Sequence, residues 1–139
     1  TRRRRPVVVS PRGPAEKVMP TEARVRAFIA RVEHDPLGAI RDFYHADASM
    51  QENHGARREG MDALLAGEEA ALKRMGGIPK ATCLHLAITG DTVFINWRFE
   101  MGPAQPNLVL DEVAMQVWDG DRIRSERFYY DPAQLRPSA

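Results

Sequence analysis

The sequence lacks the features that several large classes of protein require. Cys83 is the single cysteine among 139 residues, which excludes a disulfide framework and a cysteine-based zinc site. No apolar run approaches the ~20 residues of a membrane-spanning helix. Lys and Arg number 20 against 19 Asp and Glu, for a net charge of +1. This balance gives no electrostatic reason to expect nucleic acid or an anionic membrane as a partner.

The sequence shows no signal-peptide pattern. The basic run Arg2–Arg5 is followed by three valines and then Ser-Pro, which is too short for the apolar region of a signal peptide. We therefore expect a protein of a reducing, cytoplasmic setting with no membrane partner.

The remaining composition is that of an ordinary globular domain. Hydrophobic residues make up 43% and charged residues 28% of the chain, and this length suits a single core. Prolines and the basic cluster predict an extended N-terminal arm over residues 1–19, followed by one domain over residues 20–139. The arm is either a leader ahead of a start at Met19 or a nucleic-acid contact. A short basic run alone is a weak signal, which favours the leader.

The first half of the domain carries helical patterns. Thr21 can cap a helix whose apolar residues recur at positions 25, 28, 29 and 32 and which ends before Pro36. A short second helix follows Pro36, and a third runs from about Met61 to Met75. Glu68 projects to the centre of the apolar stripe of this third helix. A carboxylate there is costly unless an arginine pairs with it or a cavity wets it.

The second half reads as strands. We expect strands at Asp47–His54 and at about 80–89, 92–101, 108–118 and 122–130, with a turn at Gly55–Gly60. Gly-Asp and Asp-Gly pairs at 90–91 and 119–120 predict two hairpins. Helices followed by antiparallel strands indicate an α+β fold, and a curved sheet wrapped by helices leaves a concave face suited to a small-molecule site.

Glu52 is the first candidate for chemistry. Met50, Glu52 and His54 share one face of the expected strand, so Glu52 would be an acidic group on an apolar surface. It is either a general base in an apolar cavity or a strand-edge residue paired with Arg57 or Arg58.

The last hairpin leaves two registers open. A two-residue turn at Asp119-Gly120 would set Glu112 opposite Arg127 as a cross-strand ion pair. A three-residue turn with a bulge would shift the register by one. It would bring to one face Glu112, Gln116, Glu126, Phe128 and Tyr130. Two carboxyl groups on one buried face repel each other, which raises at least one pKa and suits acid/base chemistry.

Four segments, taken in order, resemble a known family. FYHADASMQE, GARREGMDALL, VAMQVWDGDRI and ERFYYDPAQL resemble the SnoaL-like branch of the NTF2-like superfamily from about Thr21 to Leu135. The resemblance implies an α+β cone, in which three N-terminal helices pack on a strongly bent mixed or antiparallel sheet. It also implies a homodimer, and it supports the bulged register.

The resemblance extends to ketosteroid isomerase, the best understood relative. The catalytic aspartate of that enzyme falls on Glu52, its oxyanion tyrosine on Phe28 and its protonated oxyanion aspartate on Ala114. Neither Phe28 nor Ala114 can donate a side-chain hydrogen bond to an enolate, so the ketosteroid reaction itself is not expected. The acidic residue that SnoaL polyketide cyclases use near the end of the last strand falls at about Phe128, two residues after Glu126.

Two functional hypotheses follow. The first is an acid/base isomerase, cyclase or hydrolase that acts on a small, mostly apolar organic ligand in an internal pocket, with catalytic residues Glu52, Glu112 and Glu126. The second is a non-catalytic module that binds a small molecule or a protein. The predicted ligand-binding residues are Phe28, Tyr44, Met50, His54, Glu68, Trp97, Ala114, Gln116, Trp118, Phe128 and Tyr130. No organic cofactor is implied, and no metal motif is present, although Glu52, His54 and Glu126 could converge.

Overall fold

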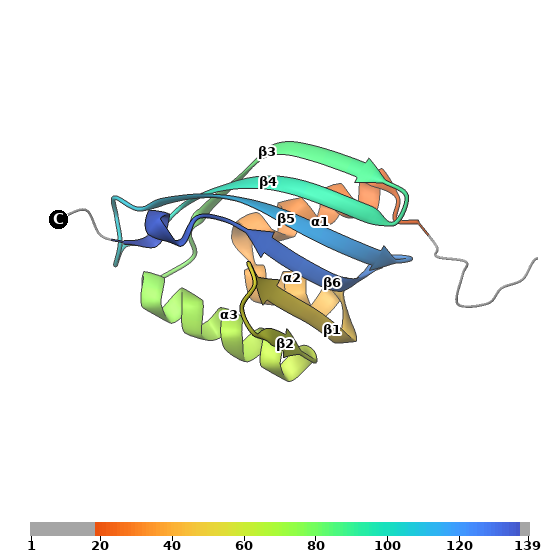
Figure 1. The fold of residues 1–139 in the computed structure, drawn as a ribbon, viewed down its shortest axis with the longest axis horizontal. Coiled ribbons are helices and arrows are strands. Elements are labelled where there is room, and N and C mark those ends of the chain that lie inside the picture. Colours follow the sequence, from red (N-terminus) through yellow and green to blue (C-terminus); the bar gives the residue numbers. More distant parts are fainter. Residues whose placement is uncertain (1–18, 137–139) are drawn as a thin grey trace, which may run out of the picture.

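The computed structural model describes residues 19–136, so all of the expected N-terminal arm except Met19 lies outside the described residues. Within these residues, three α-helices, six strands and one short 3-10 helix follow one another (Figure 1). They are α1 (Glu22–His34), α2 (Pro36–Phe43), β1 (Tyr44–Glu52), β2 (Arg57–Glu59), α3 (Met61–Met75), β3 (Lys80–Thr89), β4 (Thr92–Glu100), β5 (Val109–Asp119), β6 (Arg122–Tyr129) and η1 (Pro132–Leu135). The α+β prediction is confirmed.

Side-chain caps define the first two helices. The Thr21 hydroxyl accepts a hydrogen bond from the Arg24 backbone N–H at 3.1 Å, which satisfies one free donor at the start of α1. Asp35 caps α2 in the same way through the Gly38 N–H at 2.9 Å. Pro36 occupies the first turn of α2, where its missing N–H costs nothing. The sharp break between the two helices is thus encoded locally.

All six strands form one mixed sheet in the order β2-β1-β6-β5-β4-β3. Only the pairing of β1 with β6 is parallel, and the other four pairings are antiparallel. Figure 1 shows α1 and α2 behind the curled sheet and α3 along its β1–β2 end. The helices therefore cover one face of the sheet and leave the other face outward.

The β5–β6 hairpin has neither of the two predicted turns, but it gives the faces expected of the bulged register. Asp119 pairs with Arg122 across the turn, and the register then shifts by one residue between Trp118 and Val117. Arg124 is the extra residue, and beyond it Gln116 lies opposite Glu126. The bulge therefore lies within β6 and not in the turn, and it places the even-numbered residues of both strands on the same face.

Two strand boundaries differ from the predictions. β1 begins at Tyr44 and not at Asp47, because the backbone of Tyr44 already pairs with Ile123 of β6. The segment expected to be a turn contains the short strand β2, which pairs with β1 from Ser49 to Gln51. Three polar residues show no apolar alternation, so β2 has no sequence signal of its own.

No helix among residues 19–136 is long and apolar enough to span a membrane.

Candidate functional site

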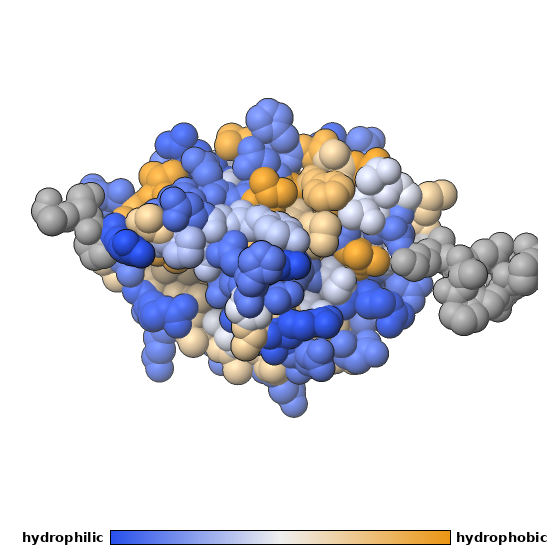
Figure 2. All heavy atoms as spheres, in the orientation of Figure 1, coloured by the Kyte–Doolittle hydropathy of each residue, from blue (hydrophilic) through white to orange (hydrophobic). Residues whose placement is uncertain are grey.

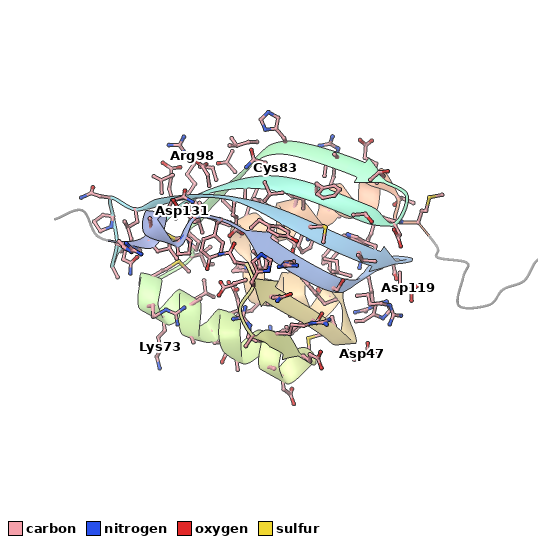
Figure 3. All side chains as sticks on the ribbon, in the orientation of Figure 1. Asp47, Lys73, Cys83, Arg98, Asp119 and Asp131 are labelled. Carbon is pink, nitrogen blue, oxygen red and sulfur yellow. The ribbon has the colours of Figure 1, made fainter. Side chains whose placement is uncertain are left out.

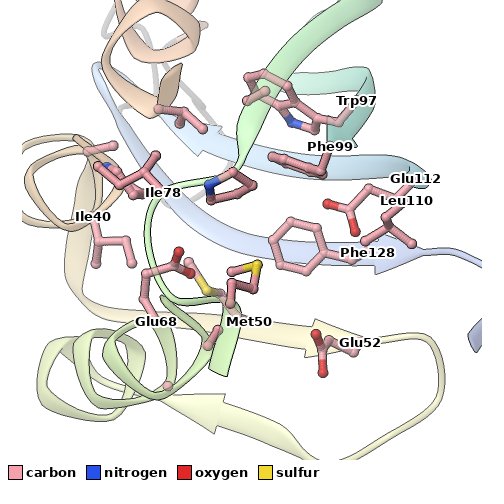
Figure 4. Close-up of a pocket in the computed structure, with 18 of the residues that line it drawn as sticks. Ile40, Met50, Glu52, Glu68, Ile78, Trp97, Phe99, Leu110, Glu112 and Phe128 are labelled. Carbon is pink, nitrogen blue, oxygen red and sulfur yellow. The ribbon is translucent and has the colours of Figure 1, made fainter. Parts of the chain in front are cut away.

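A cavity of about 420 Å³ lies between the helices and the concave face of the sheet (Figure 4). Apolar side chains from α1, α2, β1, β4, β5 and β6 form most of its wall. They include Phe28, Ile40, Met50, Trp97, Phe99, Leu110 and Phe128. Such a wall, with a few polar groups set into it, is typical of small-molecule sites.

Charged groups interrupt this apolar wall on several sides. Each of four elements contributes one carboxyl group, and two arginines from β2 and α3 also line the cavity. These residues are Glu52, Glu68, Glu112, Glu126, Arg58 and Arg74. The formal charge of the lining is therefore negative.

Glu126 is held at the base of the cavity by two donors. Its side chain is 4% exposed, the Tyr44 hydroxyl donates to Oε1, and the Gln116 amide donates to Oε2. Burial raises the pKa of Glu126 to about 7, although the donors from Gln116 and Tyr44 lower it and the charge of Glu68 raises it. A carboxyl group with this pKa can gain or lose a proton near neutral pH.

Trp118 determines which end of the Gln116 amide faces Glu126. The Trp118 indole N–H donates to Gln116 Oε1 at 2.9 Å. An indole nitrogen can only donate, so the amide oxygen must face Trp118 and the amide nitrogen must face Glu126. Both Gln116 and Trp118 are fully buried, which leaves the amide no solvent as an alternative partner.

Glu112 lies further along β5 on the same face, and it differs from Glu126 in having no partner. Its side chain is 7% exposed, and among residues 19–136 its carboxyl group makes no hydrogen bond or ion pair. Burial first, and then the charges of Glu126, Glu52 and Glu68, raise the pKa of Glu112 to about 8. The carboxyl group is thus available to a ligand in the cavity.

Three arginines on β4 and β6 pair with neither Glu112 nor Glu126. Arg98 is exposed on the outer side of β4 (Figure 3). Arg124 pairs with Asp119 at 2.7 Å. Arg127 donates to the backbone oxygen of Asn53 at 2.7 Å. The alternation of the sheet sends all three side chains away from the cavity.

Glu68 of α3 was expected to need either a cavity or a neighbouring arginine. It has both, because it lines the cavity and lies near Arg58 and Arg74. Burial raises its pKa, the Arg58 charge lowers it, the Glu52 charge raises it and the Arg74 charge lowers it. Arg58 reaches this position by crossing α3 at Gly67, where an added Cβ would lie 3.0 Å from Arg58 Nε. The buried Arg58 Nε has no hydrogen-bond partner among the described residues.

Glu52 lies on the cavity wall at the end of β1, but its side chain is exposed. No ion pair joins it to Arg57 or Arg58 within the described chain, and Arg57 instead donates to the Ser49 hydroxyl at 3.1 Å. Tyr130 lies beside Glu52. Burial raises the pKa of Tyr130, and the charges of Glu52 and Glu112 raise it further.

Four of the predicted ligand-binding residues do not line the cavity. His54 is exposed and contacts Arg127, because Asn53 adopts a left-handed backbone with φ of 50° and ends the strand alternation. Its convergence with Glu52 and Glu126 therefore does not occur. Ala114, Gln116 and Trp118 face the concave side as predicted but are 0% exposed, and Phe28 of α1 packs against Trp118. The Phe28 and Trp118 rings lie 6.1 Å apart.

Ten predicted site residues do line the cavity, from six separate elements or their ends. They are Phe28, Tyr44, Met50, Glu52, Glu68, Trp97, Glu112, Glu126, Phe128 and Tyr130. Sequence reasoning missed Arg58, Arg74, Phe99 and Leu110. Phe99 lies two residues after Trp97 on β4 and so shares its face, and the centroids of the two stacked rings are 5.5 Å apart. Nothing in the sequence indicates that Arg58 crosses α3.

The fold and its acidic cavity define a curled α+β cone with a closed-over concave face, and comparison with known proteins identifies its family. The SnoaL-like domain family matches residues 25–126. The chain belongs to this family. No curated protein matches the sequence.

Solved structures share the fold at low sequence identity. A hypothetical protein with a ketosteroid isomerase-like fold from Catenulispora acidiphila DSM 44928, in complex with trimethylamine, is 20% identical with a TM-score of 0.68, covering 83% of this chain and 90% of its own. A proposed SnoaL-like polyketide cyclase from Jannaschia sp. CCS1 is 10% identical with a TM-score of 0.67, covering 81% and 89%. An NTF2-like protein of unknown function from Burkholderia pseudomallei K96243 is 12% identical with a TM-score of 0.69, covering 81% and 92%. These likenesses confirm the NTF2-like cone.

Proposed function

We propose that the cavity binds a small, mostly apolar organic ligand and that the protein performs acid/base chemistry on it, as an isomerase, cyclase or hydrolase. The observation that carries the proposal is the presence of two buried carboxyl groups, Glu112 and Glu126, in one apolar cavity. A structure of the same fold in complex with trimethylamine supports a cavity that takes small organic molecules. The proposal adds a specific site and a type of chemistry to the family membership.

The two carboxyl groups suit different roles. Glu126 is the proposed base, because the donors from Tyr44 and Gln116 orient it and support its ionised form. Glu112 is the proposed group that binds the polar part of the ligand and shares a proton with it, because its carboxyl has no partner in the described chain. Their pKa values of about 7 and about 8 are close to the pH at which proton transfer is most useful.

Glu52 takes a secondary place in this proposal. It was the first candidate on sequence grounds, but its side chain is exposed, whereas Glu112 and Glu126 are buried. We propose that Glu52 contributes its negative charge to the cavity mouth beside Tyr130 and acts on Glu112 and Glu68 through that charge.

Proton exchange into a simple ketone tests the catalytic proposal. We expect the wild type to catalyse deuterium incorporation from D2O into the α-carbons of cyclohexanone, measured by mass spectrometry, because a buried carboxylate can remove the α-proton. Glu126→Gln should lower the rate by at least ~100-fold, the range attributed to general-base catalysis. Glu69→Gln, on the exposed side of α3, is the matched control and should retain the rate.

The same measurement separates enzyme from binder. An exchange rate in Glu126→Gln equal to that of the wild type would contradict the role of Glu126. Binding of cyclohexanone without exchange, detected by ligand-observed NMR, would favour the alternative of a non-catalytic ligand-binding module. The absence of donors at Phe28 and Ala114 is the specific observation in favour of that alternative.

We also propose a homodimer formed through the outer face of the sheet. Phe94, Val113 and Tyr129 are 36%, 38% and 39% exposed on this face, and Val113 lies opposite Tyr129 on adjacent strands. Figure 2 shows apolar residues, in orange, among the hydrophilic ones on the face formed by β3–β6. Apolar groups exposed together in this way favour a protein contact.

Light scattering after size exclusion tests the dimer. The wild type should have twice the 15.6 kDa mass of the chain, and Val113→Lys should shift it to the monomer because a lysine charge cannot be buried cheaply in the contact. Ala70→Lys, on exposed α3, is the control that should remain dimeric. A monomeric wild type, or a dimeric Val113→Lys protein, would contradict this interface.

A further inference from the structure

The surroundings of Glu112 favour one charge for a ligand in the cavity. Trp97 is the cross-strand partner of Glu112, Phe99 stacks on Trp97, and all three line the cavity with Phe128. In the view of Figure 4, the Phe128 ring lies between the carboxyl groups of Glu112 and Glu52. A buried carboxyl group without a partner is therefore set among three aromatic rings.

The arginines of the cavity do not balance the charge of the Glu112 carboxyl group. Arg58 and Arg74 are the arginines that line the cavity, and both act on Glu68, where each lowers the pKa. The charges that act on Glu112 are those of Glu126, Glu52 and Glu68, all of them negative. Among the described residues, the positive charge is thus matched on the α3 side of the cavity and lacking on the sheet side.

Three kinds of ligand can be compared on this basis. An anion would be repelled by each carboxyl group of β1, α3, β5 and β6 that is ionised. A neutral hydrocarbon would leave the buried Glu112 carboxyl without a partner, which is costly. An organic cation would pair with that carboxyl group and lie against aromatic faces, whose electron-rich surfaces attract cations.

We propose that the cavity takes a small organic ammonium ion, with its nitrogen at Glu112 and its apolar body against Trp97, Phe99 and Phe128. This inference names the ligand class of the proposed site and rests on the cavity being a ligand site, but it does not depend on the acid/base step. Trimethylated and protonated amines both satisfy it, since the recognition is by charge and by aromatic contact.

Binding of such a cation should be linked to the release of a proton. In the free protein, Glu112 faces Glu126 from β6, Glu52 from β1 and Glu68 from α3, with Tyr44, Tyr130, Arg58 and Arg74 as the other titratable groups of the lining. The cation favours the ionised form of Glu112. Its affinity should therefore rise with pH, by up to ~10-fold per pH unit below the pKa of the free protein.

Two molecules of the same shape provide the test. Phenyltrimethylammonium and tert-butylbenzene differ in charge and hardly in volume, and ligand-observed NMR or calorimetry can measure the affinity of each for the full chain. We expect the cation to bind more tightly than the hydrocarbon at pH 8, and its affinity to fall at least ~10-fold on going to pH 6. Glu112→Gln should abolish this pH dependence, and calorimetry in two buffers should detect the released proton.

The possible failures are distinguishable. Equal or tighter binding of tert-butylbenzene, or a cation affinity that does not change with pH, would overturn the charge inference and leave the cavity as a site for neutral ligands. Binding of neither molecule would overturn the ligand site itself. The pH series on the wild type needs no variant, so the inference stays testable even if Glu112→Gln does not fold.

Discussion

Replacing Glu112 with glutamine is expected to stabilise the protein at alkaline pH and to leave its stability almost unchanged near pH 4. The carboxyl group is buried and unpaired in the folded chain, and its pKa is about 8 there against an ordinary value of 4.5. Between these values the folded state holds one proton more than the unfolded state. The contribution of the protonated Glu112 to the free energy of unfolding is therefore complete below about pH 4.5, and it is lost as pH rises through 8.

The size of the effect follows from the gap between the two pKa values. It corresponds to at most ~5 kcal/mol of lost stability above pH 8, and Glu112→Gln removes this loss because an amide does not ionise. Urea unfolding between pH 4 and pH 9 measures it, as the difference in free energy of unfolding between variant and wild type. Glu69→Gln, on the exposed face of α3, is the control. A Glu112→Gln protein with the same pH profile as the wild type would contradict the burial of an ionisable Glu112.

Removing Trp118 is expected to cost more stability than any other single side-chain truncation discussed for this protein. The side chain is fully buried, packs against Phe28 and donates to Gln116. Trp118→Ala should lower the free energy of unfolding by ~3–5 kcal/mol, since a large core side chain leaves a cavity that the surroundings fill only in part. Chemical denaturation at neutral pH measures this loss.

Trp118→Phe separates packing from hydrogen bonding. It keeps an aromatic ring but removes the donor, which leaves Gln116 Oε1 without a partner at a cost of ~1–3 kcal/mol. The amide is then free to turn its nitrogen away from Glu126, so the pKa of Glu126 should rise above about 7. Carbon-detected NMR titration of the glutamate carboxyl groups follows this change.

Trp97→Phe is the matched control for this experiment. Trp97 is a buried indole on the neighbouring strand and lines the cavity, and its indole makes no hydrogen bond within the described residues. Its replacement should cost packing energy without moving the pKa of Glu126. An unchanged Glu126 pKa in Trp118→Phe would show that the orientation of Gln116 does not depend on the indole.

The sequence by itself determined the elements and their faces. Capping at Thr21, the apolar spacing of α1 and the alternation around Trp97 are local properties, because helix and strand periods follow from backbone geometry. Four segments in order pointed to the NTF2-like cone, and the resemblance favoured inner positions for Glu52, Glu112 and Glu126, although the strand pattern left the register of the last hairpin open. The inner position of Glu68 also followed from helical period alone.

The tertiary structure alone decided the register and the depth of each group. Whether Glu126 shares a face with Glu112 depends on the single extra residue Arg124 in β6, and a strand pattern cannot show which of two pairings has the lower energy. The left-handed Asn53 removed His54 from the face predicted for it.

Depth separates residues that the sequence treats alike. Glu112 and Gln116 lie on the same face of β5, but Gln116 is fully buried outside the cavity, whereas Glu112 lines it. Glu52 shares the inner face of β1 with Met50 yet ends at the exposed mouth. Alternation tells which way a side chain points. What packs over it, and so whether its charge is screened by water or raised in pKa by burial, is set by segments distant in the chain.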